Sequence, residues 1–195
     1  VDSLLIGGGM CFTFLKAKGF EIGKSLLEED LLEYAQDVLS EAENRGVSIQ
    51  LPTDVVVADR VAPDAESRIV PVSEIPPGWM GVDIGPETAK AFREVIKTAK
   101  TIFWNGPMGV FEIDKFAGGT REIASAVGES TATSIIGGGD TVAAVERFSA
   151  ASRMSFISTG GGASMKLLGG ASLPGVEVLQ DREAGAGGRA ATAAM

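Results

Sequence analysis

The sequence predicts an α/β protein with a Rossmann-like parallel sheet and helices on both faces, in three α/β/α layers. Two observations lead to this prediction: short apolar strands alternate with helical segments, and clusters of glycine follow four of the strands. Alternating strands and helices are typical of right-handed crossover units, which build parallel sheets. Because the carboxyl ends of parallel strands share one edge, the four glycine clusters are expected to meet there.

The composition is that of a globular protein and excludes several classes of function. The chain has 195 residues, of which 45% are hydrophobic, enough for a sizeable core. Its net charge of −9 argues against nucleic acid or an anionic membrane as a partner. The sequence has no histidine, which excludes imidazole catalysis and histidine-ligated zinc, and its single cysteine, Cys11, leaves no intrachain disulfide.

The first predicted unit is a strand, Ser3–Ile6, that runs into Gly7–Gly9 and a short helix, Met10–Lys18. Gly19 is placed to end this helix. A longer helix follows, with Ser25 and Glu28 as its capping box and Gly46 at its end. Its core-packing stripe, at helical spacing, consists of Leu31, Leu32, Ala35, Val38, Leu39 and Ala42.

The middle of the chain predicts four short strands and one helix. Val47–Leu51 and Val55–Ala58 are apolar and β-branched, and Met80–Ile84 follows a proline-rich turn. Ile69–Val72 is expected at a sheet edge, because Pro71 cannot donate to a ladder. The helix Glu87–Lys100 begins after a proline. The residues that it is expected to bury are Ala91, Phe92, Val95, Ile96 and Ala99.

The second half of the chain repeats the strand–glycine–helix theme of Ser3–Gly9. The predicted strands are Thr101–Trp104, Ser134–Ile136 and Ser155–Ser158, and the helices after their glycine turns are Thr120–Val127, Thr141–Phe148 and Ala163–Leu168. Three Gly-Gly-Gly triplets and an Asn-Gly-Pro turn at one sheet edge indicate a phosphate or nucleotide site. Neither a Walker A sequence nor a G-x-G-x-x-G fingerprint is present, so backbone N–H groups and helix N-termini are expected to hold the phosphates.

Asp140 follows the triplet Gly137–Gly139, just before the predicted helix. Its carboxylate is placed to bind a nucleotide-bound Mg²⁺, although a plain helix cap would use the same residue. Glu112, past the Asn-Gly-Pro turn, is either a ribose ligand or a solvated loop acid. Phe12 and Val55–Val57 either wall an adenine pocket or pack in the core.

Five segments, in the same order, resemble phosphoglycerate kinase, and together they cover nearly the whole chain up to about Leu179. They are Leu5–Met10, Gly78–Pro86, Trp104–Glu112, Gly137–Thr141 and Ser158–Ser164. The resemblance implies the nucleotide-binding, C-terminal domain of that kinase, over residues 1–181, and a disordered Ala/Gly-rich tail at 182–195. It implies reversible phosphoryl transfer between 1,3-bisphosphoglycerate and Mg-ADP, which gives 3-phosphoglycerate and Mg-ATP in glycolysis or carbon fixation.

The resemblance also assigns roles to individual residues. Those implied at the adenine are Gly8, Gly9, Gly81 and Val82, and those implied elsewhere on the nucleotide are Asn105, Pro107, Val110 and Glu112, with Glu112 on the ribose. Those implied at the phosphates are Gly138, Gly139, Asp140 and Thr141, with Asp140 as the Mg²⁺ ligand. Those implied to present N–H groups to the phosphoryl group in transit are Gly160, Gly161 and Gly162.

Parts of the family pattern have no counterpart in this sequence. The N-terminal domain that binds 3-phosphoglycerate and the strand–helix unit that carries two phosphate-binding lysines are expected to be missing. The piece is therefore expected to bind ATP or ADP with little or no kinase activity, and to expose a sheet edge. The parent is expected to be a monomer of the cytoplasm or plastid, with no membrane or nucleic-acid partner.

Two other functions compete with this interpretation. One is a nucleotide-binding module or interaction fragment that takes no part in catalysis. The other is an NAD-type dehydrogenase, which the missing dinucleotide fingerprint and the absence of histidine disfavour.

Overall fold

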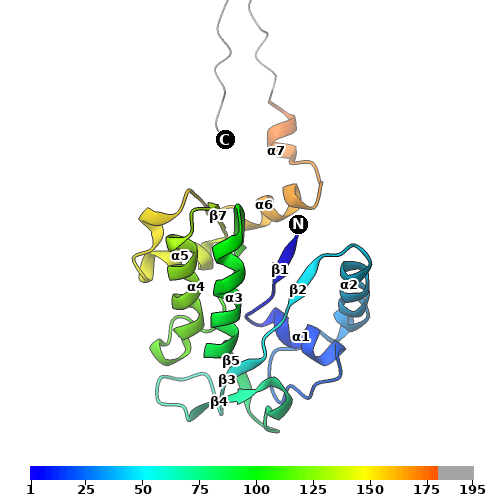
Figure 1. Ribbon diagram of the computed structural model, residues 1–195, viewed down its shortest axis with the longest axis vertical. Coiled ribbons are helices and arrows are strands. Elements are labelled where there is room, and N and C mark those ends of the chain that lie inside the picture. The colour runs from blue at the N-terminus through cyan, green and yellow to red at the C-terminus, as the bar shows by residue number, and fades with distance from the viewer. Residues whose placement is uncertain (180–195) are drawn as a thin grey trace, which may run out of the picture. The chain divides into compact units, whose positions relative to one another are not determined.

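The computed structural model describes residues 1–179 and contains two compact units, Val1–Gly161 and Gly162–Met195 (Figure 1). The predicted tail, 182–195, lies outside the described residues. The first unit holds all of the described strands and therefore the sheet edge at which a site was expected.

Two parallel sheets carry the strand–glycine–helix units. The first pairs β1 (Ser3–Leu5) with β2 (Ser48–Gln50), and the second has the order β6 (Thr101–Asn105), β7 (Thr133–Gly137), β8 (Phe156–Ser158). A third sheet is antiparallel, in the order β4 (Ser67–Pro71), β3 (Asp54–Ala58), β5 (Met80–Ile84). Parallel sheets flanked by helices confirm the predicted α/β class.

All of the predicted helices form, with ends that differ by a few residues. They are α1 (Met10–Ala17), α2 (Leu32–Asn44), α3 (Pro86–Thr98), α4 (Gly118–Glu129), α5 (Gly139–Arg147) and α6 (Gly161–Leu168). A four-residue helix, α7 (Pro174–Glu177), was not predicted. Short 3-10 turns lie at Glu29–Leu31, Val72–Glu74, Asp114–Phe116 and Ala151–Arg153.

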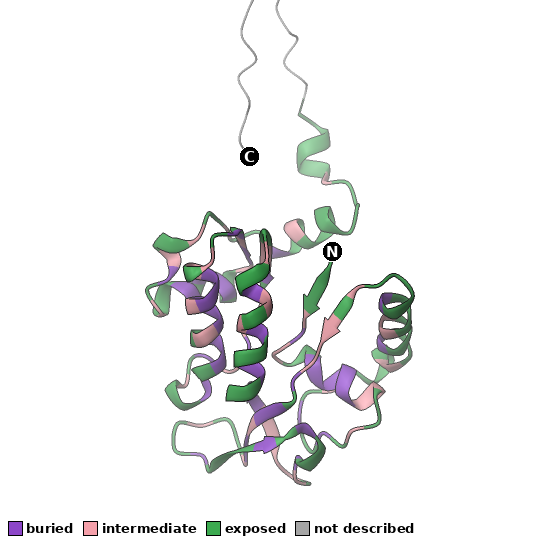
Figure 2. Ribbon diagram, in the orientation of Figure 1, coloured by how far each residue is buried: buried purple, intermediate pink, exposed green. Residues whose placement is uncertain are grey.

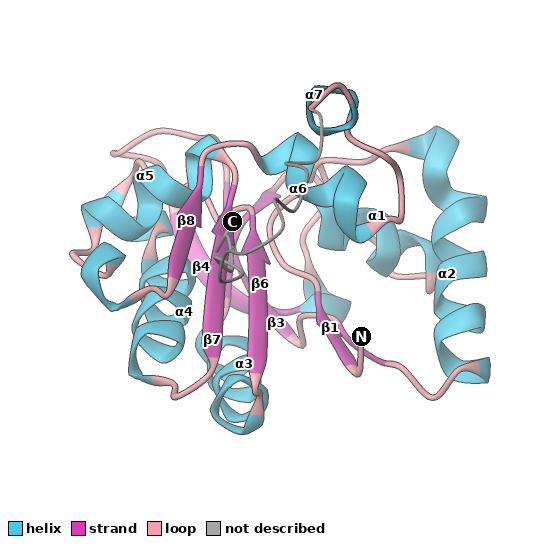
Figure 3. Ribbon diagram, turned by 90° about the horizontal axis from the view of Figure 1, so that it is seen from above, coloured by secondary structure: helices cyan, strands magenta, loops and turns pink. Residues whose placement is uncertain are grey.

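Two large apolar clusters build the core of the first unit, and Figure 2 shows their buried residues along the inward faces of the helices. One cluster packs α3, α4 and α5 against the sheet of β6, β7 and β8 (Figure 3). The other joins α1 and α2 to β2 and to the antiparallel sheet. Phe12 belongs to this second cluster and is 3% exposed, so its core-packing interpretation is confirmed, and Cys11 lies in the same cluster at 1% exposed.

The antiparallel sheet was not foreseen, although its strands were. A polar loop at residues 59–66 returns the chain directly from β3 to β4, and a direct return forces antiparallel pairing. Alternation then sends Val55 and Val57 into the cluster around α1, while Val56 packs with Phe116 on the opposite face. Pro71 ends β4 on the outer side of this sheet, as predicted for an edge strand.

The predicted capping box is wrong. The 3-10 turn Glu29–Leu31 separates Ser25 from α2, and no side chain caps the first turn of that helix. The Ser25 hydroxyl instead accepts a hydrogen bond from the Gly81 N–H at 2.8 Å, which ties the loop before α2 to β5. Within the predicted stripe, Ala35 and Ala42 are buried, whereas Leu31 is 46% exposed.

The start of α3 is anchored by a residue of β3. The buried Asp54 carboxylate accepts hydrogen bonds from the N–H groups of Glu87 and Thr88, at 3.1 and 2.8 Å. These N–H groups have no acceptor within the helix, so the carboxylate provides one for each of them. Its negative charge also interacts favourably with the positive end of the helix dipole. This anchor rotates α3 so that Thr88 and Ala89 are buried and Ala91 is exposed, which corrects the predicted buried face.

Within the described residues, β1 pairs only with β2, and β6 pairs only with β7. The Asp2 carbonyl and the Ile6 N–H bond to β2, so alternation directs the polar backbone groups of Ser3 and Leu5 toward the other edge. The first unit thus has an open edge on each of its parallel sheets, as the sequence predicted.

Candidate nucleotide site at the glycine loops

The first two glycine segments meet at the turn that follows β6, residues 105–109. The Gly8 N–H donates to the Met108 carbonyl at 3.2 Å, and Gly8 has a φ of +61°. A Cβ atom at position 8 would lie 2.7 Å from the Pro107 carbonyl oxygen, so only glycine fits. The first and second glycine segments therefore meet as expected, although the strands before them, β1 and β6, belong to different sheets and not to the single sheet that was predicted.

The third and fourth glycine segments pack against the same turn. The Gly138 N–H donates to the Ser158 carbonyl at 3.0 Å, and a Cβ at Gly161 would lie 2.6 Å from the Gly138 Cα. The Asn105 side chain lies beside both loops, with Nδ2 3.4 Å from that Cβ position and Oδ1 3.1 Å from the equivalent position at Gly138. Asn105 is thus the point at which the turn and two glycine loops converge.

Two buried threonines, Thr120 and Thr141, hold the turn in place, a role that was not predicted for either residue. The Thr141 hydroxyl accepts the Gly106 N–H at 2.6 Å, and the Trp104 indole N–H donates to the Gly106 carbonyl at 2.7 Å. The Thr120 hydroxyl accepts the N–H groups of both Met108 and Gly109. Thr141 is 1% exposed, so its hydroxyl acts on the site by fixing the backbone of Gly106.

The N-terminus of α5 presents backbone N–H groups that have no acceptor within the helix. The first intrahelical bond runs from the Val142 N–H to the Gly138 carbonyl, which leaves the N–H groups of Gly139 and Asp140 without an acceptor in the helix. Gly139 and Asp140 are both exposed, and Gly138 turns the chain with a φ of +90°. Exposed N–H groups at the positive end of a helix dipole favour a phosphate.

Asp140 fits the role of a ligand to Mg²⁺ that arrives with a nucleotide. Its carboxylate is exposed in the first turn of α5, directly after the glycine loop. In the part of the chain that the structure describes, no three His, Cys, Asp or Glu residues are grouped to hold a metal. Because Mg²⁺ in nucleotide sites is held by one or two carboxylates together with phosphates and water, a single exposed carboxylate is sufficient.

The residues assigned to the adenine lie in the loop after β1 and in β5, and those assigned to the rest of the nucleotide lie in and after the turn that follows β6. A Cβ at Gly81 would lie 1.9 Å from the Phe12 ring, so packing on Phe12 already requires glycine there. The carbonyl of Val82 accepts the Val110 N–H at 2.8 Å, which joins β5 to the residues after Gly109. Gly9 and Glu112 are exposed and Pro107 is half-buried.

The residues assigned to the moving phosphoryl group differ in their surroundings. Gly160 is exposed, and its N–H donates to the Ser158 hydroxyl at 3.2 Å. Gly161 is buried by its close approach to Gly138. Gly162 is exposed and begins the second unit. Their catalytic role stays a prediction.

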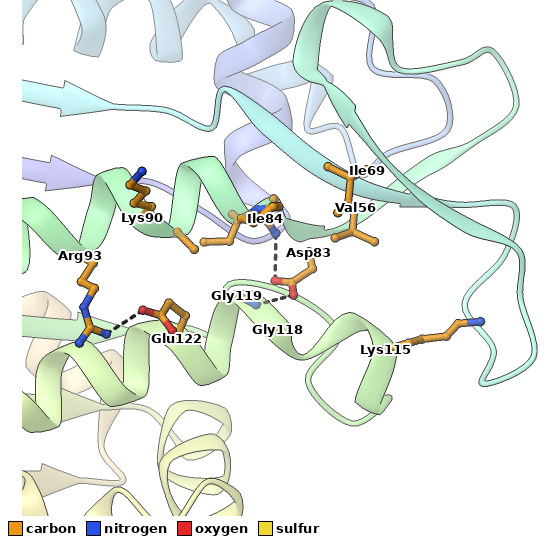
Figure 4. Close-up of a pocket in the computed structure, with 13 residues that line it drawn as sticks. Val56, Ile69, Asp83, Ile84, Lys90, Arg93, Lys115, Gly118, Gly119 and Glu122 are labelled. Atoms are coloured by element: carbon orange, nitrogen blue, oxygen red, sulfur yellow. Dashed lines mark hydrogen bonds and ion pairs between the residues drawn. The ribbon is translucent and has the colours of Figure 1, made fainter.

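Asp83 is a buried acid beside this site that the sequence analysis overlooked. It is 4% exposed and accepts the N–H groups of Ile84 and Gly119, at 2.9 and 2.7 Å, as Figure 4 shows. Burial raises the pKa of Asp83 to about 7, although the two N–H groups act in the opposite direction. The sequence did contain a signal for this burial, because Asp83 stands between two apolar residues of a predicted strand, Val82 and Ile84.

Cys11 offers no redox chemistry here, because burial raises the pKa of its thiol to about 12. Among residues 1–179, no helix combines the length and the apolar character needed to cross a bilayer.

Comparison with known families decides where the chain belongs. The family model of phosphoglycerate kinase matches residues 1–171. The chain belongs to the phosphoglycerate kinase family.

Individual members of the phosphoglycerate kinase family are similar over most of the chain. "Phosphoglycerate kinase 3, cytosolic" of Arabidopsis thaliana is 58% identical over 93% of this chain and 46% of its own length. "Phosphoglycerate kinase 2, chloroplastic" of the same plant is 58% identical over 92% of this chain and 38% of its own length. The solved phosphoglycerate kinase of Coxiella burnetii superposes with a TM-score of 0.87, at 45% identity, over 91% of this chain and 46% of that one. The chain thus spans about half the length of the relatives that it matches.

The raised pKa of Asp83 predicts an unusual pH dependence of stability. Between about pH 4 and pH 7 the folded protein keeps a proton that the unfolded chain has released, so this group's contribution to stability falls as the pH rises through that window. In the parent, this group should lower the free energy of unfolding by a few kcal/mol between about pH 4 and pH 7, at ~1.4 kcal/mol per pKa unit. We expect Asp83→Asn to remove that decrease. Urea unfolding of both proteins at about pH 4.5 and about pH 7.5 measures it.

The matched control is Asp37→Asn, at an exposed acid of α2, which should leave the pH dependence of the parent unchanged. Parallel stability curves for Asp83→Asn and the parent would show that Asp83 is ionised throughout and that its burial carries no such penalty.

Proposed function

We propose that this chain is the nucleotide-binding, C-terminal half of a phosphoglycerate kinase. The complete enzyme would transfer a phosphoryl group reversibly between 1,3-bisphosphoglycerate and Mg-ADP, and so form 3-phosphoglycerate and Mg-ATP in glycolysis or carbon fixation. The observation that supports this half of the enzyme most directly is the convergence of three glycine loops on the turn after β6, beside the N-terminus of α5. That arrangement suits a chain of phosphates.

The nucleotide would be held chiefly by backbone groups. The N–H groups of Gly139 and Asp140 would bind phosphate oxygens, and the Asp140 carboxylate would hold Mg²⁺. When bound, Mg²⁺ neutralises charge on the phosphates, which the net charge of −9 would otherwise repel. Glu112 would accept hydrogen bonds from the ribose, and Gly8, Gly9, Gly81 and Val82 would line the adenine.

The buried hydroxyls would contribute by fixing the turn, not by touching substrate. Thr141 and Thr120 accept three N–H groups of residues 106–109, so the turn is held before any ligand arrives. Donors that are already oriented stabilise charge without the cost of reorganisation. Asn105 lies beside both Gly138 and Gly161, so a nucleotide that contacts Asn105 would also lie next to these two glycine loops.

The chain alone would provide only the nucleotide side of the active site. Phosphoryl transfer requires both substrates in line across a closed cleft, and the relatives are about twice as long as this chain. The open edges of β1 and β6 are where we place the strand–helix unit of the family that this sequence lacks. A complete parent would be a monomer of the cytoplasm or of a plastid.

The binding of ADP is the first test of this proposal. Calorimetric titration should give Mg²⁺-dependent binding, and Asp140→Asn should weaken Mg-ADP binding about tenfold or more while ADP without Mg²⁺ is little affected, because only the metal ligand is lost. Asp64→Asn, at an exposed loop acid, is the control and should bind as the parent does.

A folded chain that gives no heat with ADP at millimolar concentration would contradict the nucleotide site. Equal affinity of the parent and Asp140→Asn for Mg-ADP would contradict the assignment of the metal ligand alone.

A second test concerns catalysis. In a coupled assay with 3-phosphoglycerate and Mg-ATP, the chain alone should show no activity above buffer, and activity should return when the missing part of a relative is supplied on a second chain. Full activity of the chain alone would contradict the proposal that this chain binds only the nucleotide and needs a second part of the enzyme to bind 3-phosphoglycerate. Binding of ADP without any recovery on complementation would favour the non-catalytic nucleotide-binding module.

A further inference from the structure

A cavity of about 450 Å³ lies between α3, α4 and the antiparallel sheet, and none of the residues that line it belongs to the glycine loops (Figure 4). Its walls are mainly apolar and include Val56, Ile69 and Ile84 from the three strands and Ala89 from α3. Ile69 is 57% exposed, so part of its side chain is open to a ligand. Cavities that hold small molecules have volumes of about 300–1,000 Å³ and mostly apolar walls, so this one has a suitable size and lining.

The α4 side of the cavity is open because it carries two glycines. Packing explains only one of them: a Cβ at Gly119 would lie 2.3 Å from the Ile84 side chain, whereas a Cβ at Gly118 would meet only Asp83, at 3.7 Å. Gly118 has no positive φ that would require glycine either. A side chain could be accommodated at position 118, and its absence keeps the cavity open.

The charged residues around the cavity favour an anion. Lys90, Arg93 and Lys115 line it, against Asp83 and Glu122. Arg93 is already paired with Glu122 and Glu129, and the Lys115 ammonium donates to the Ala65 carbonyl. Lys90 is exposed and makes no hydrogen bond or ion pair within residues 1–179. The pKa of Glu94, one turn further along α3, is lowered chiefly by Lys97 and also by Lys90, so the charge of Lys90 is only partly offset.

We propose that this cavity binds a small organic anion with an apolar body, such as an aliphatic or aromatic carboxylate. The apolar part lies against Val56, Ile69 and Ile84, and the carboxylate reaches Lys90 at the mouth. This site is separate from the glycine loops and does not depend on the proposed kinase function.

The test is an NMR titration of the ¹⁵N-labelled chain with octanoate below its micelle concentration. Octanoate should shift the backbone signals of Ile69, Lys90 and Gly118 in a saturable manner and leave Gly139 and Asp140 unchanged. Octylammonium, which has the same aliphatic chain and the opposite charge, should bind about fivefold or more weakly, in line with the loss of one partly exposed charge pair.

Two variants locate the site. Gly118→Leu, which fills the open wall, should abolish the saturable shifts. Lys90→Glu changes an exposed residue and should weaken octanoate binding about threefold or more. Lys100→Glu makes the same charge change beyond the end of α3, at a residue that does not line the cavity, and should bind octanoate as the parent does.

The proposal is overturned if octanoate causes no saturable shifts, if octylammonium binds equally well, or if Lys90→Glu and Lys100→Glu behave alike. Shifts spread over exposed apolar residues of several elements would indicate only nonspecific adsorption and would overturn it as well. A failure of ADP to bind would not affect this result, because the two titrations follow different signals.

Discussion

The hydrogen bond between the Gly106 N–H and the Thr141 hydroxyl, at 2.6 Å, is the contact on which the candidate site depends most. It ties the turn after β6 to the first turn of α5, and Gly8 and Gly161 then approach this assembly too closely for any side chain. Pre-formed donors of this kind suit a ligand whose recognition is mainly electrostatic. The buried threonine therefore matters because it fixes backbone geometry, even though it is not exposed to bind a phosphate.

Two buried acids of the antiparallel sheet, Asp54 and Asp83, also fix backbone geometry. Asp54 anchors α3 to β3, and Asp83 anchors the first turn of α4 to β5. Asp54 accepts two N–H groups in the first turn of α3, and Asp83 accepts one in the first turn of α4, and these N–H groups have no acceptor within their own helices. The same two helices border the apolar cavity, so these two anchors also set its width.

Most of the elements followed from the sequence, because the periodicity of apolar residues is a local property. The strand–glycine–helix units and the meeting of their glycine loops were predicted correctly from this pattern and from the geometry of parallel strands. The antiparallel sheet, the hydrogen bond of Ser25 to Gly81 and the burial of Asp83 were not predicted, since each depends on residues distant in sequence. The role of Thr141 was missed for the same reason: its partner, Gly106, is 35 residues away.

The most direct test of this account is the affinity of Thr141→Val for Mg-ADP, compared with that of Thr133→Val at an exposed position of β7. Valine keeps the shape of threonine but cannot accept the Gly106 N–H. If the turn is fixed by this bond, Thr141→Val should weaken Mg-ADP binding about tenfold and change the backbone NMR signals of residues 105–109, a loss that fits one buried unpaired donor at ~1–3 kcal/mol. Thr133→Val should have no effect. Parental affinity and unchanged turn signals in Thr141→Val would contradict the account.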